Sequence, residues 1–373
     1  MQKISTFLPA ILLAVLFLLV PEQPDAKRRK TRHARRVHRS SVVVVSDSAG
    51  LVRAMVPYTG APQQGRHYAE AVNSYARLLK SDSVRVFTLI APGQAEFYMP
   101  RDKAPAVSEK SIINSYAAFL DHDVTPVFVA DTLRTHIDEA IYSRTDHHWA
   151  PLGAYYAAAK FAKDAGVDFR PLTEYTPDTI RNYVGTMADR GGGAAVRRSP
   201  ENFIYFKPRT EYVSEFVNYT ASGRISGSAT PHSEEFFKHY PDGSKAAYCV
   251  FMGGDNHTVK VSNTGAKPGR RLLIVKDSFG NAMVPTLCGS FEEVHVTDFR
   301  YYPGSLLRYI RDNRITDLLF VNTISIAFDP KTAKRLIALQ TGAPKAVKAT
   351  KAKKASKGRK AKKVKKAKRS KNR

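Results

Sequence analysis

Two short stretches of this 373-residue sequence concentrate side chains that can do chemistry. Residues 145–152 read Thr-Asp-His-His-Trp-Ala-Pro-Leu, and they hold an acid, two histidines and the only tryptophan of the chain. Asp146 and His148 are two positions apart, so an extended loop can direct both side chains to one side. The carboxylate can then bond one ring nitrogen and leave the other free to act as a general base.

The second stretch is residues 276–281, Lys-Asp-Ser-Phe-Gly-Asn, which follow the apolar run 271–275. A serine at a strand-to-helix turn is exposed at the edge of a sheet, and the first amides of the helix point toward the oxyanion that its attack would create. This position suits a nucleophile, and it equally suits a helix cap. A serine also needs a base, and the first stretch offers one. Together the two stretches favour a triad of Ser278, His148 and Asp146.

Alternating strands and helices are predicted around these stretches. Short, largely apolar runs predict buried strands over residues 83–91, 124–130, 271–275, 294–298 and 317–322. Apolar residues at three-to-four spacing and helix-boundary residues predict helices over residues 62–80, 112–120, 151–166 and 305–313, and another after Ser278. This alternation predicts an α/β domain whose helices cover both faces of a mostly parallel sheet. Reactive groups gather at the carboxyl ends of such strands, where Ser278 is expected.

The domain is expected to span residues 46–341 and to contain an inserted segment. Residues 168–270 are rich in Tyr, Thr, Gly and Pro with short alternating runs, which predicts loops and small antiparallel strands. An uninterrupted apolar run near the start has the length of a signal-peptide core, so residues 1–26 are predicted to be a signal peptide or an N-terminal anchor. Residues 27–45 are predicted to be a basic linker.

The formal net charge of +26 is concentrated at the ends of the sequence. Residues 27–39 hold 8 Lys and Arg, residues 345–373 hold 16, and neither segment contains an acid. The body between them is close to neutral, which argues against a folded nucleic-acid-binding face. The Lys/Ala-rich tail, residues 342–373, is expected to be disordered. Through residues 345–373 it should bind polyanions such as anionic lipid, lipopolysaccharide or, nonspecifically, nucleic acid.

Cys249 and Cys288 are the only cysteines. Two cysteines are too few for a disulfide scaffold or a four-cysteine zinc site. In an oxidising compartment they could pair, but both also have apolar neighbours in the sequence, where a free thiol packs as a small hydrophobe. The sequence leaves both arrangements open.

The run YSRTDHHWAPLGAYY resembles the signature of the bacterial DHHW-motif protein family, and its Asp-x-His-Trp element is similar to that of the alginate O-acetylation proteins of the SGNH-hydrolase-like group. The stretches YCVFMGGDNHTVKV, LLIVKDSFGNAMVPTL and HVTDFRYY resemble the second half of the family. The resemblance covers roughly residues 45–330. It implies a three-layer α/β/α SGNH-hydrolase-like domain. Ser278 would be the nucleophile, His148 the general base and Asp146 its orienting acid.

The implied function is acyl-ester chemistry, as an acetylesterase or O-acetyltransferase, on a cell-envelope or exported polysaccharide. An acyl donor protein would be a further partner, and the location would be the periplasm or cell envelope, with or without an anchor in the inner membrane. No cofactor and no metal is expected. Further candidates for oxyanion or substrate binding, chosen by position, are His147, Gly253, Gly254, Asn281, Arg300 and Asn322.

Two other functions remain open. An Asp-His-His string also suits a metal-dependent phosphoesterase, because imidazoles and a carboxylate are good metal ligands. Such enzymes need further acids, and the Gly-Asp-Asn-His string at residues 254–257 has no companion cluster. The third candidate is a non-catalytic envelope-binding protein that acts through its basic tail.

Overall fold

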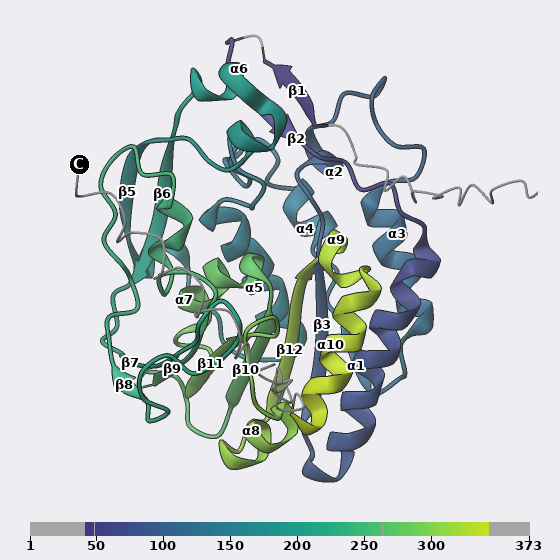
Figure 1. Ribbon diagram of the computed structural model, residues 1–373, viewed down its shortest axis with the longest axis vertical. Coiled ribbons are helices and arrows are strands. Elements are labelled where there is room, and N and C mark those ends of the chain that lie inside the picture. The colour runs from purple at the N-terminus through teal and green to yellow at the C-terminus, as the bar shows by residue number, and fades with distance from the viewer. Residues whose placement is uncertain (1–41, 48, 263, 343–373) are drawn as a thin grey trace, which may run out of the picture. The chain divides into compact units, whose positions relative to one another are not determined.

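The computed structural model describes residues 42–47, 49–262 and 264–342 (Figure 1). The predicted signal peptide or anchor and the basic tail lie outside these residues. Within the described ranges, no helix is both long and apolar enough to cross a membrane.

An eight-stranded sheet forms the centre of the domain. Its strands, in spatial order, are β4 (Val124–Pro126), β3 (Arg85–Ala91), β12 (Asp317–Thr323), β10 (Arg271–Lys276), β11 (Glu293–Asp298), β9 (His257–Ser262), β7 (Val213–Asn218) and β8 (His232–Ser233). The strands from β4 to β11 pair in parallel, and β9, β7 and β8 continue the sheet in antiparallel pairing. The predicted α/β fold with a mostly parallel sheet is confirmed.

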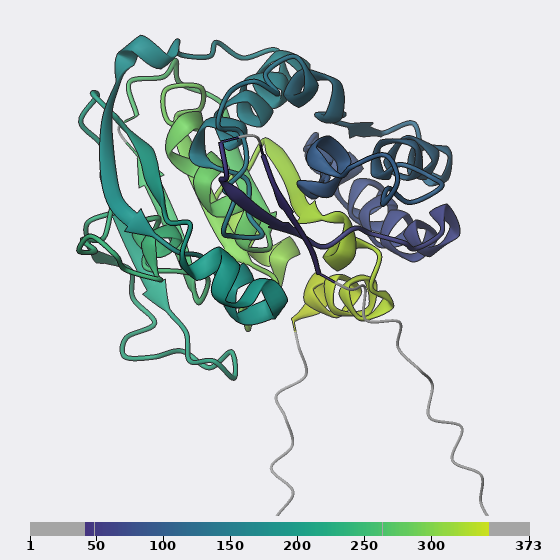
Figure 2. The same cartoon turned by 90° about the horizontal axis from the view of Figure 1, so that it is seen from above.

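Helices cover both faces of this sheet because its inner strands are apolar on both sides. Successive residues of a strand point to opposite faces. In β12, Leu318 and Phe320 enter a buried cluster with the helices α1 and α10, whereas Leu319 and Val321 enter another with the helix α5. α1 and α10 lie side by side on their face (Figure 1), and the view from above shows β12 between the two helix layers (Figure 2). The three-layer α/β/α arrangement is therefore present.

The helices begin and end where the sequence provides boundary residues. α5 starts with Pro151 at its first position and stops at Gly166, whose φ of 62° is the left-handed conformation that glycine adopts easily. The α-helices are α1 (Arg66–Leu79), α2 (Ala95–Tyr98), α3 (Glu109–Tyr116), α4 (Ala130–Arg134), α5 (Pro151–Ala165), α6 (Gly193–Arg197), α7 (Val284–Leu287), α8 (Leu306–Asp312), α9 (Ile324–Ala327) and α10 (Pro330–Thr341). The other helical turns are η1 (Pro62–Gly65), η2 (Lys80–Asp82), η3 (Ala117–Phe119), η4 (Leu172–Glu174), η5 (Ala188–Gly192), η6 (Ala247–Val250) and η7 (Ser278–Met283).

The segment predicted as an insert, residues 168–270, divides into two parts. β5 (Tyr175–Tyr183) and β6 (Glu201–Pro208) form a separate two-stranded sheet. β7, β8 and β9 instead join the central sheet, because β9 pairs with β11 and buries Val259 and Val261 in the same cluster as α5. A further hairpin, β1 (Val43–Ser46) and β2 (Val52–Met55), was not predicted. Its first strand takes residues 43–45 of the predicted basic linker, because the run of β-branched valines there pairs with β2.

Adjacent leucines near the end of α1 provide a test of the core. Leu79 is 0% exposed, whereas Leu78 is 44% exposed. Leu79→Ala should lower the free energy of unfolding by about 2–5 kcal/mol because it leaves a cavity between α1 and the sheet. Leu78→Ala makes the same change in helix propensity and should cost less than about 0.5 kcal/mol. Denaturant titration of the two variants measures the difference, and equal losses would contradict this packing of α1.

Candidate functional site

The serine stretch forms the turn that follows β10. Ser278 is the first residue of η7, a tight 3₁₀ helix. The Asp277 carboxylate fixes this turn, since it accepts the amide of Phe279 at 2.9 Å and the amide of Thr323, at the end of β12, at 2.8 Å. Burial raises the pKa of Asp277 to about 6. Ser278 is thereby held at the carboxyl edge of the parallel strands, as expected for an open α/β sheet.

The histidine stretch lies against this turn and leads into α5. Trp149 is fully buried, and its indole N–H donates to the carbonyl of Phe279 at 3.0 Å. The next residues begin α5, which packs against η7. The tryptophan thus ties the histidine loop to the backbone of the serine turn.

Three side chains from the two stretches form a continuous hydrogen-bonded chain. His148 Nε2 lies 2.7 Å from Ser278 Oγ, and His148 Nδ1 lies 2.8 Å from Asp146 Oδ2. An ionised carboxylate only accepts, so Nδ1 carries the proton toward Asp146, and in this tautomer Nε2 can accept the serine hydroxyl proton. Asp146 and His148 are buried, whereas Ser278 is partly exposed and can meet a substrate.

The Asp146 carboxylate is surrounded by donors. Tyr183 donates its hydroxyl to Oδ2 at 2.8 Å, and Thr186 donates its amide at 3.1 Å and its hydroxyl to Oδ1. Gly185 makes this approach possible, because a Cβ there would collide with Asp146. Burial alone would raise the pKa of Asp146, but the charges and hydrogen bonds of His148 and His147 bring it well below its ordinary value. The carboxylate is therefore kept ionised.

Tyr248 supports the His148 ring from one side. The two rings are stacked with centroids 3.8 Å apart and planes 3° apart. The Tyr248 hydroxyl also donates to the carbonyl of Ser278 at 3.0 Å and approaches that of Phe279 at 3.3 Å. One buried side chain thus contacts both the imidazole and the backbone of the serine turn.

His147 takes part in the same cluster but does not contact the serine hydroxyl. Its Nδ1 lies 3.0 Å from Asp146 Oδ1 and 2.8 Å from the hydroxyl of Thr186. Burial and the neighbouring His148 lower the pKa of His147 to about 4, although Asp146 acts in the opposite direction. His147 is therefore neutral near pH 7.

Several of the remaining sequence candidates meet in a partly buried ionic cluster around Lys276, the last residue of β10. Lys276 lies 3.0 Å from Asp255 and 3.1 Å from Asp298, and Arg300 bonds the same two carboxylates. Asn281 donates its amide to Asp255 Oδ1 at 2.9 Å. Arg300 and Asn281 thus contact charged side chains of the protein, and their contacts indicate a structural role.

The two glycines and Asn322, the other oxyanion candidates, differ in whether they have a free hydrogen-bond donor. The amides of Gly253 and Gly254 already donate to the carbonyls of Cys249 and Phe251. Asn322 accepts the Tyr68 hydroxyl at 2.5 Å, and its buried Nδ2 has no partner among the described residues. Asn322 therefore keeps a free donor on the face of β12 that packs against α1, and the two glycine amides do not.

Asp146, His147 and His148 could also hold a metal ion, since one ligand atom from each lies within 4.8 Å of the others. An ionised carboxylate offers about four acceptor positions. In this site the donors of Tyr183, Thr186 and the two imidazoles occupy Asp146. The arrangement fits an orienting acid better than a metal ligand.

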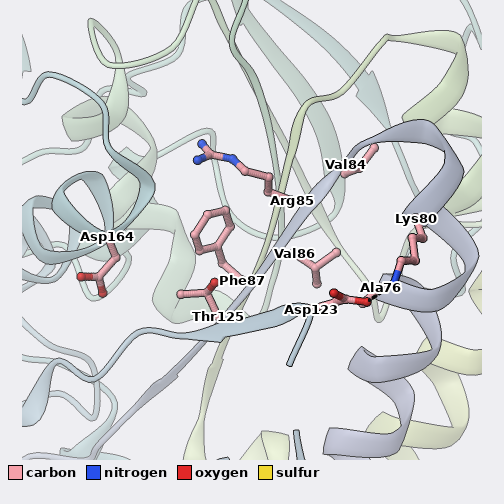
Figure 3. Close-up of a pocket in the computed structure, with 9 residues that line it drawn as sticks. All are labelled: Ala76, Lys80, Val84, Arg85, Val86, Phe87, Asp123, Thr125 and Asp164. Atoms are coloured by element: carbon pink, nitrogen blue, oxygen red, sulfur yellow. Dashed lines mark hydrogen bonds and ion pairs between the residues drawn. The ribbon is translucent and has the colours of Figure 1, made fainter. Parts of the chain in front are cut away.

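A cavity of about 160 Å³ adjoins the triad. Its lining includes His147 and Phe279 beside the serine, together with Tyr58, Glu109 and Arg190. Another hollow, of about 290 Å³, lies at the amino ends of β3 and β4 (Figure 3). Its Lys80 and Asp123 pair with each other at 3.0 Å, and it is far along the strands from the serine.

Sequence reasoning missed Tyr183, Thr186 and Tyr248, which contact the triad, and Glu109 and Arg190, which line the adjoining cavity. Tyr248 begins the YCVFMGGDNHTVKV stretch that resembles the family, but the stretch gave it no role, and the other four lie outside the stretches that carried the prediction. Tyr183 is 37 residues from Asp146, and only the folded β5 brings it near. Cys249 and Cys288, whose pairing the sequence left open, are both free.

Comparison with known proteins adds independent findings. A model of the DHHW protein family matches residues 37–297. The structure of a DHHW family protein from Eubacterium siraeum is 35% identical with a TM-score of 0.70, and the match covers 80% of this chain and 96% of that one. Bacillus cereus PatB1 with a sulfonyl adduct is 21% identical with a TM-score of 0.59, covering 77% and 96%. The O-acetyltransferase domain of Pseudomonas putida AlgJ is 14% identical with a TM-score of 0.41, covering 79% and 99%. No curated protein matches the sequence.

The protonation of His147 is directly measurable. We expect its imidazole to stay neutral at pH 6 and to titrate near pH 4, because burial and the adjacent His148 disfavour its cation. NMR titration of the histidine ring nuclei measures this, with His147→Gln identifying the signal. A His147 signal that titrates near the ordinary value of about 6.5 would contradict the described cluster.

Proposed function

Since the chain belongs to the DHHW protein family, we propose that it is an acyl-ester enzyme, an acetylesterase or O-acetyltransferase, in which Ser278 is the nucleophile. His148 would be its general base and Asp146 the acid that orients the imidazole. The observation that carries the proposal is the hydrogen-bonded chain of these residues, with distances of 2.8 and 2.7 Å. This geometry matches the roles of a Ser-His-Asp triad.

The first half of the reaction transfers the acyl group to the enzyme. The Ser278 oxygen attacks the carbonyl carbon of the ester while His148 Nε2 takes the hydroxyl proton. A tetrahedral oxyanion forms and collapses, and the bond to the leaving alcohol breaks as His148 returns the proton to it. Asp146 stays ionised and stabilises the imidazolium. The products of this half are an acyl-serine and a free alcohol.

The second half restores the serine. His148 removes a proton from water or from a sugar hydroxyl, and the oxygen attacks the acyl-serine carbonyl. The ester bond to Ser278 breaks and the serine oxygen regains a proton from His148. Water gives net hydrolysis, and a sugar hydroxyl gives acyl transfer. The triad serves both outcomes.

Two donors are proposed for the oxyanion. The amide of Ser278 begins η7, and the Asn322 Nδ2 is buried without a partner among the described residues. A buried donor without an acceptor is costly, so a charge that it can meet only during the reaction would explain its presence. Substitution of Asn322 by Asp would replace this donor with an acceptor.

The substrate class and location are also proposals. PatB1, which shares the fold, is described with a sulfonyl adduct, and the AlgJ domain is described as an O-acetyltransferase. An acetyl group on a polysaccharide of the cell envelope fits this setting and the predicted export. The basic segment 345–373 would hold the enzyme near acidic polymers through charge.

Removal of the nucleophile tests the proposal. Ser278→Ala and His148→Ala should each lower kcat for 4-nitrophenyl acetate by about 10³-fold or more, because the first removes the attacking oxygen and the second removes the base that takes its proton. A sulfonyl fluoride should modify Ser278 in the wild type, as located by mass spectrometry, and its rate should fall in His148→Ala. Ser81→Ala, at an exposed serine, is the matched control.

Three outcomes would reject the triad or redirect it. Hydrolysis that survives in Ser278→Ala excludes this nucleophile, and labelling at another residue points elsewhere. Activity on bis(4-nitrophenyl) phosphate that depends on Mn²⁺ or Zn²⁺ and is lost with chelator would support the metal-dependent phosphoesterase. A wild-type protein that hydrolyses neither ester nor phosphate, but binds anionic polymer in a salt-sensitive way, would support the tail-based binding protein.

Tyr248 should affect the chemistry through His148. Tyr248→Phe keeps the stacked ring but loses the bonds to the carbonyls of Ser278 and Phe279, so kcat should fall by less than about tenfold. Tyr248→Ala also frees the imidazole, and kcat should fall by about 10²-fold, the scale of a misplaced catalytic group. Steady-state kinetics with thermal unfolding as a folding check separates the two. Wild-type kcat in Tyr248→Ala would remove this support role.

A further inference from the structure

The cavity beside the triad is built from the edge where three parallel strands end. Gly93 follows β3, Thr323 ends β12 and Phe279 lies in the turn after β10, and all three line the cavity. His147 closes it on the side of the triad. A molecule seated here would contact His147 and Phe279, which are the direct chain neighbours of His148 and Ser278. At about 160 Å³ the space equals that of roughly five water molecules in the liquid, enough for part of a sugar ring.

Glu109 is the one buried acid in the wall of this cavity, as far as the described residues go. It is 3% exposed and lies at the first position of α3. Its Oε2 accepts the Gly93 amide at 2.6 Å and its Oε1 accepts the Tyr58 amide at 3.2 Å. No side chain of the described residues donates to this carboxylate or pairs with it. Two of its roughly four acceptor positions are therefore filled, and both donors are backbone amides.

The protein therefore supplies fewer hydrogen bonds to this carboxylate than water would. A buried charge is costly unless hydrogen bonds or an opposite charge compensate it. Burial raises the pKa of Glu109 to about 7, and the two amides offset only part of that effect. A hydroxyl donated by a bound molecule would supply a further hydrogen bond at little desolvation cost. The remaining acceptor capacity of Glu109 thus favours a ligand rich in hydroxyl groups.

The rest of the lining agrees with a sugar ring. Tyr58, Thr323 and Ser325 are polar residues of the wall; the Tyr58 hydroxyl donates to Gln64 at 2.7 Å and the Thr323 and Ser325 hydroxyls bond each other at 2.9 Å. Phe279 and Ile324 add apolar surface. Apolar surface with a few convergent polar groups is the usual make-up of a small-molecule site. The exposed Arg190 lies at the same cavity and adds a positive charge.

We propose that this cavity is the sugar subsite of the enzyme and that Glu109 is its specificity-determining residue, accepting a hydrogen bond from a ring hydroxyl of the glycan. The inference rests on the proposed function, because it is the ester on that sugar that would reach Ser278. It goes further by assigning recognition of the sugar to a residue outside the triad. A substrate without ring hydroxyls would lose this contact and bind less well.

Two acetate esters of similar shape test the subsite in the full-length protein. An O-acetylated methyl glucopyranoside carries ring hydroxyls, and cyclohexylmethyl acetate carries none. The wild type should prefer the sugar ester. At pH 8, where Glu109 is mostly ionised, Glu109→Gln should reduce kcat/KM for the sugar ester by about tenfold or more relative to the cyclohexyl ester, mainly through KM, because a charged hydrogen bond is lost. Acetate release measures both reactions.

Glu96→Gln provides the matched control. The Glu96 side chain is 5% exposed, accepts the amide of Lys110 at 3.2 Å and pairs with Arg134, but it does not line the cavity. Its loss should affect both esters equally. Glu109→Gln also weakens the tie between the loops of Tyr58 and Gly93, so thermal unfolding is measured for both variants. A structural effect alone would lower the two reactions by the same factor and would overturn the inference.

The inference and the proposed function can fail separately. Acetate release that persists in Ser278→Ala would reject the proposed function. Release that requires Ser278 but shows no preference for the sugar ester would reject the subsite. If neither ester reacts although a sulfonyl fluoride modifies Ser278, protection of that serine by methyl glucopyranoside replaces the kinetic test. Protection that disappears in Glu109→Gln supports the subsite, and absent or unchanged protection overturns it.

Discussion

The hydrogen bond between His148 and Ser278 is the constraint on which the rest of this site depends. It joins residues 130 positions apart, one in an irregular loop and the other in a turn after a buried strand. Neither segment alone could fix the position of its side chain precisely enough to make this hydrogen bond. Trp149 and Tyr248 restrict the movement of the two segments relative to each other, because both donate hydrogen bonds to backbone carbonyls of the serine turn. The distance is thus fixed by a network that surrounds it.

A second requirement is the buried negative charge of Asp146. A lone carboxylate in this position would favour protonation, and a protonated acid could no longer orient the imidazole. The compensating donors, Tyr183 and Thr186, come from the end of β5 and the loop after it. The segment inserted between the two halves of the α/β domain therefore completes the triad. Gly185 is needed there because any larger residue would push the donors away.

Much of the framework could be predicted from the sequence, because it depends on local pattern. The apolar runs of β3, β10, β11 and β12 and the spacing in α1 and α5 are visible without tertiary information. β7 to β9 fall in the segment predicted to hold loops and small antiparallel strands, but its alternating pattern could not say that they extend the central sheet, since such a pattern does not specify which neighbour a strand pairs with. The helix after Ser278 is tighter than expected, a 3₁₀ turn before the short α7.

The triad itself was predictable for a different reason, since its chemistry is concentrated in two unusual strings of residues. Its supports are ordinary tyrosines and threonines whose importance arises only from position. Tyr248 shows this: it begins one of the stretches that resemble the family, but its role appears only when its ring is found parallel to that of His148. The oxyanion candidates were chosen by position along strands, which cannot reveal that the Gly253 and Gly254 amides are already bonded.

The ionic cluster around Lys276 shows how the residues flanking the nucleophile are held. Lys276 precedes Ser278 by two positions and Asn281 follows it by three, and both contact Asp255 Oδ1. One carboxylate oxygen therefore accepts hydrogen bonds from residues on both sides of the serine. Gly280 lets the Lys276 side chain run close beneath the turn, because a Cβ there would collide with it. Buried ion pairs add little net stability compared with apolar packing, but they are intolerant of rearrangement, since moving one partner leaves a charge unpaired. That intolerance suits a turn whose serine must stay within reach of an imidazole from another part of the chain.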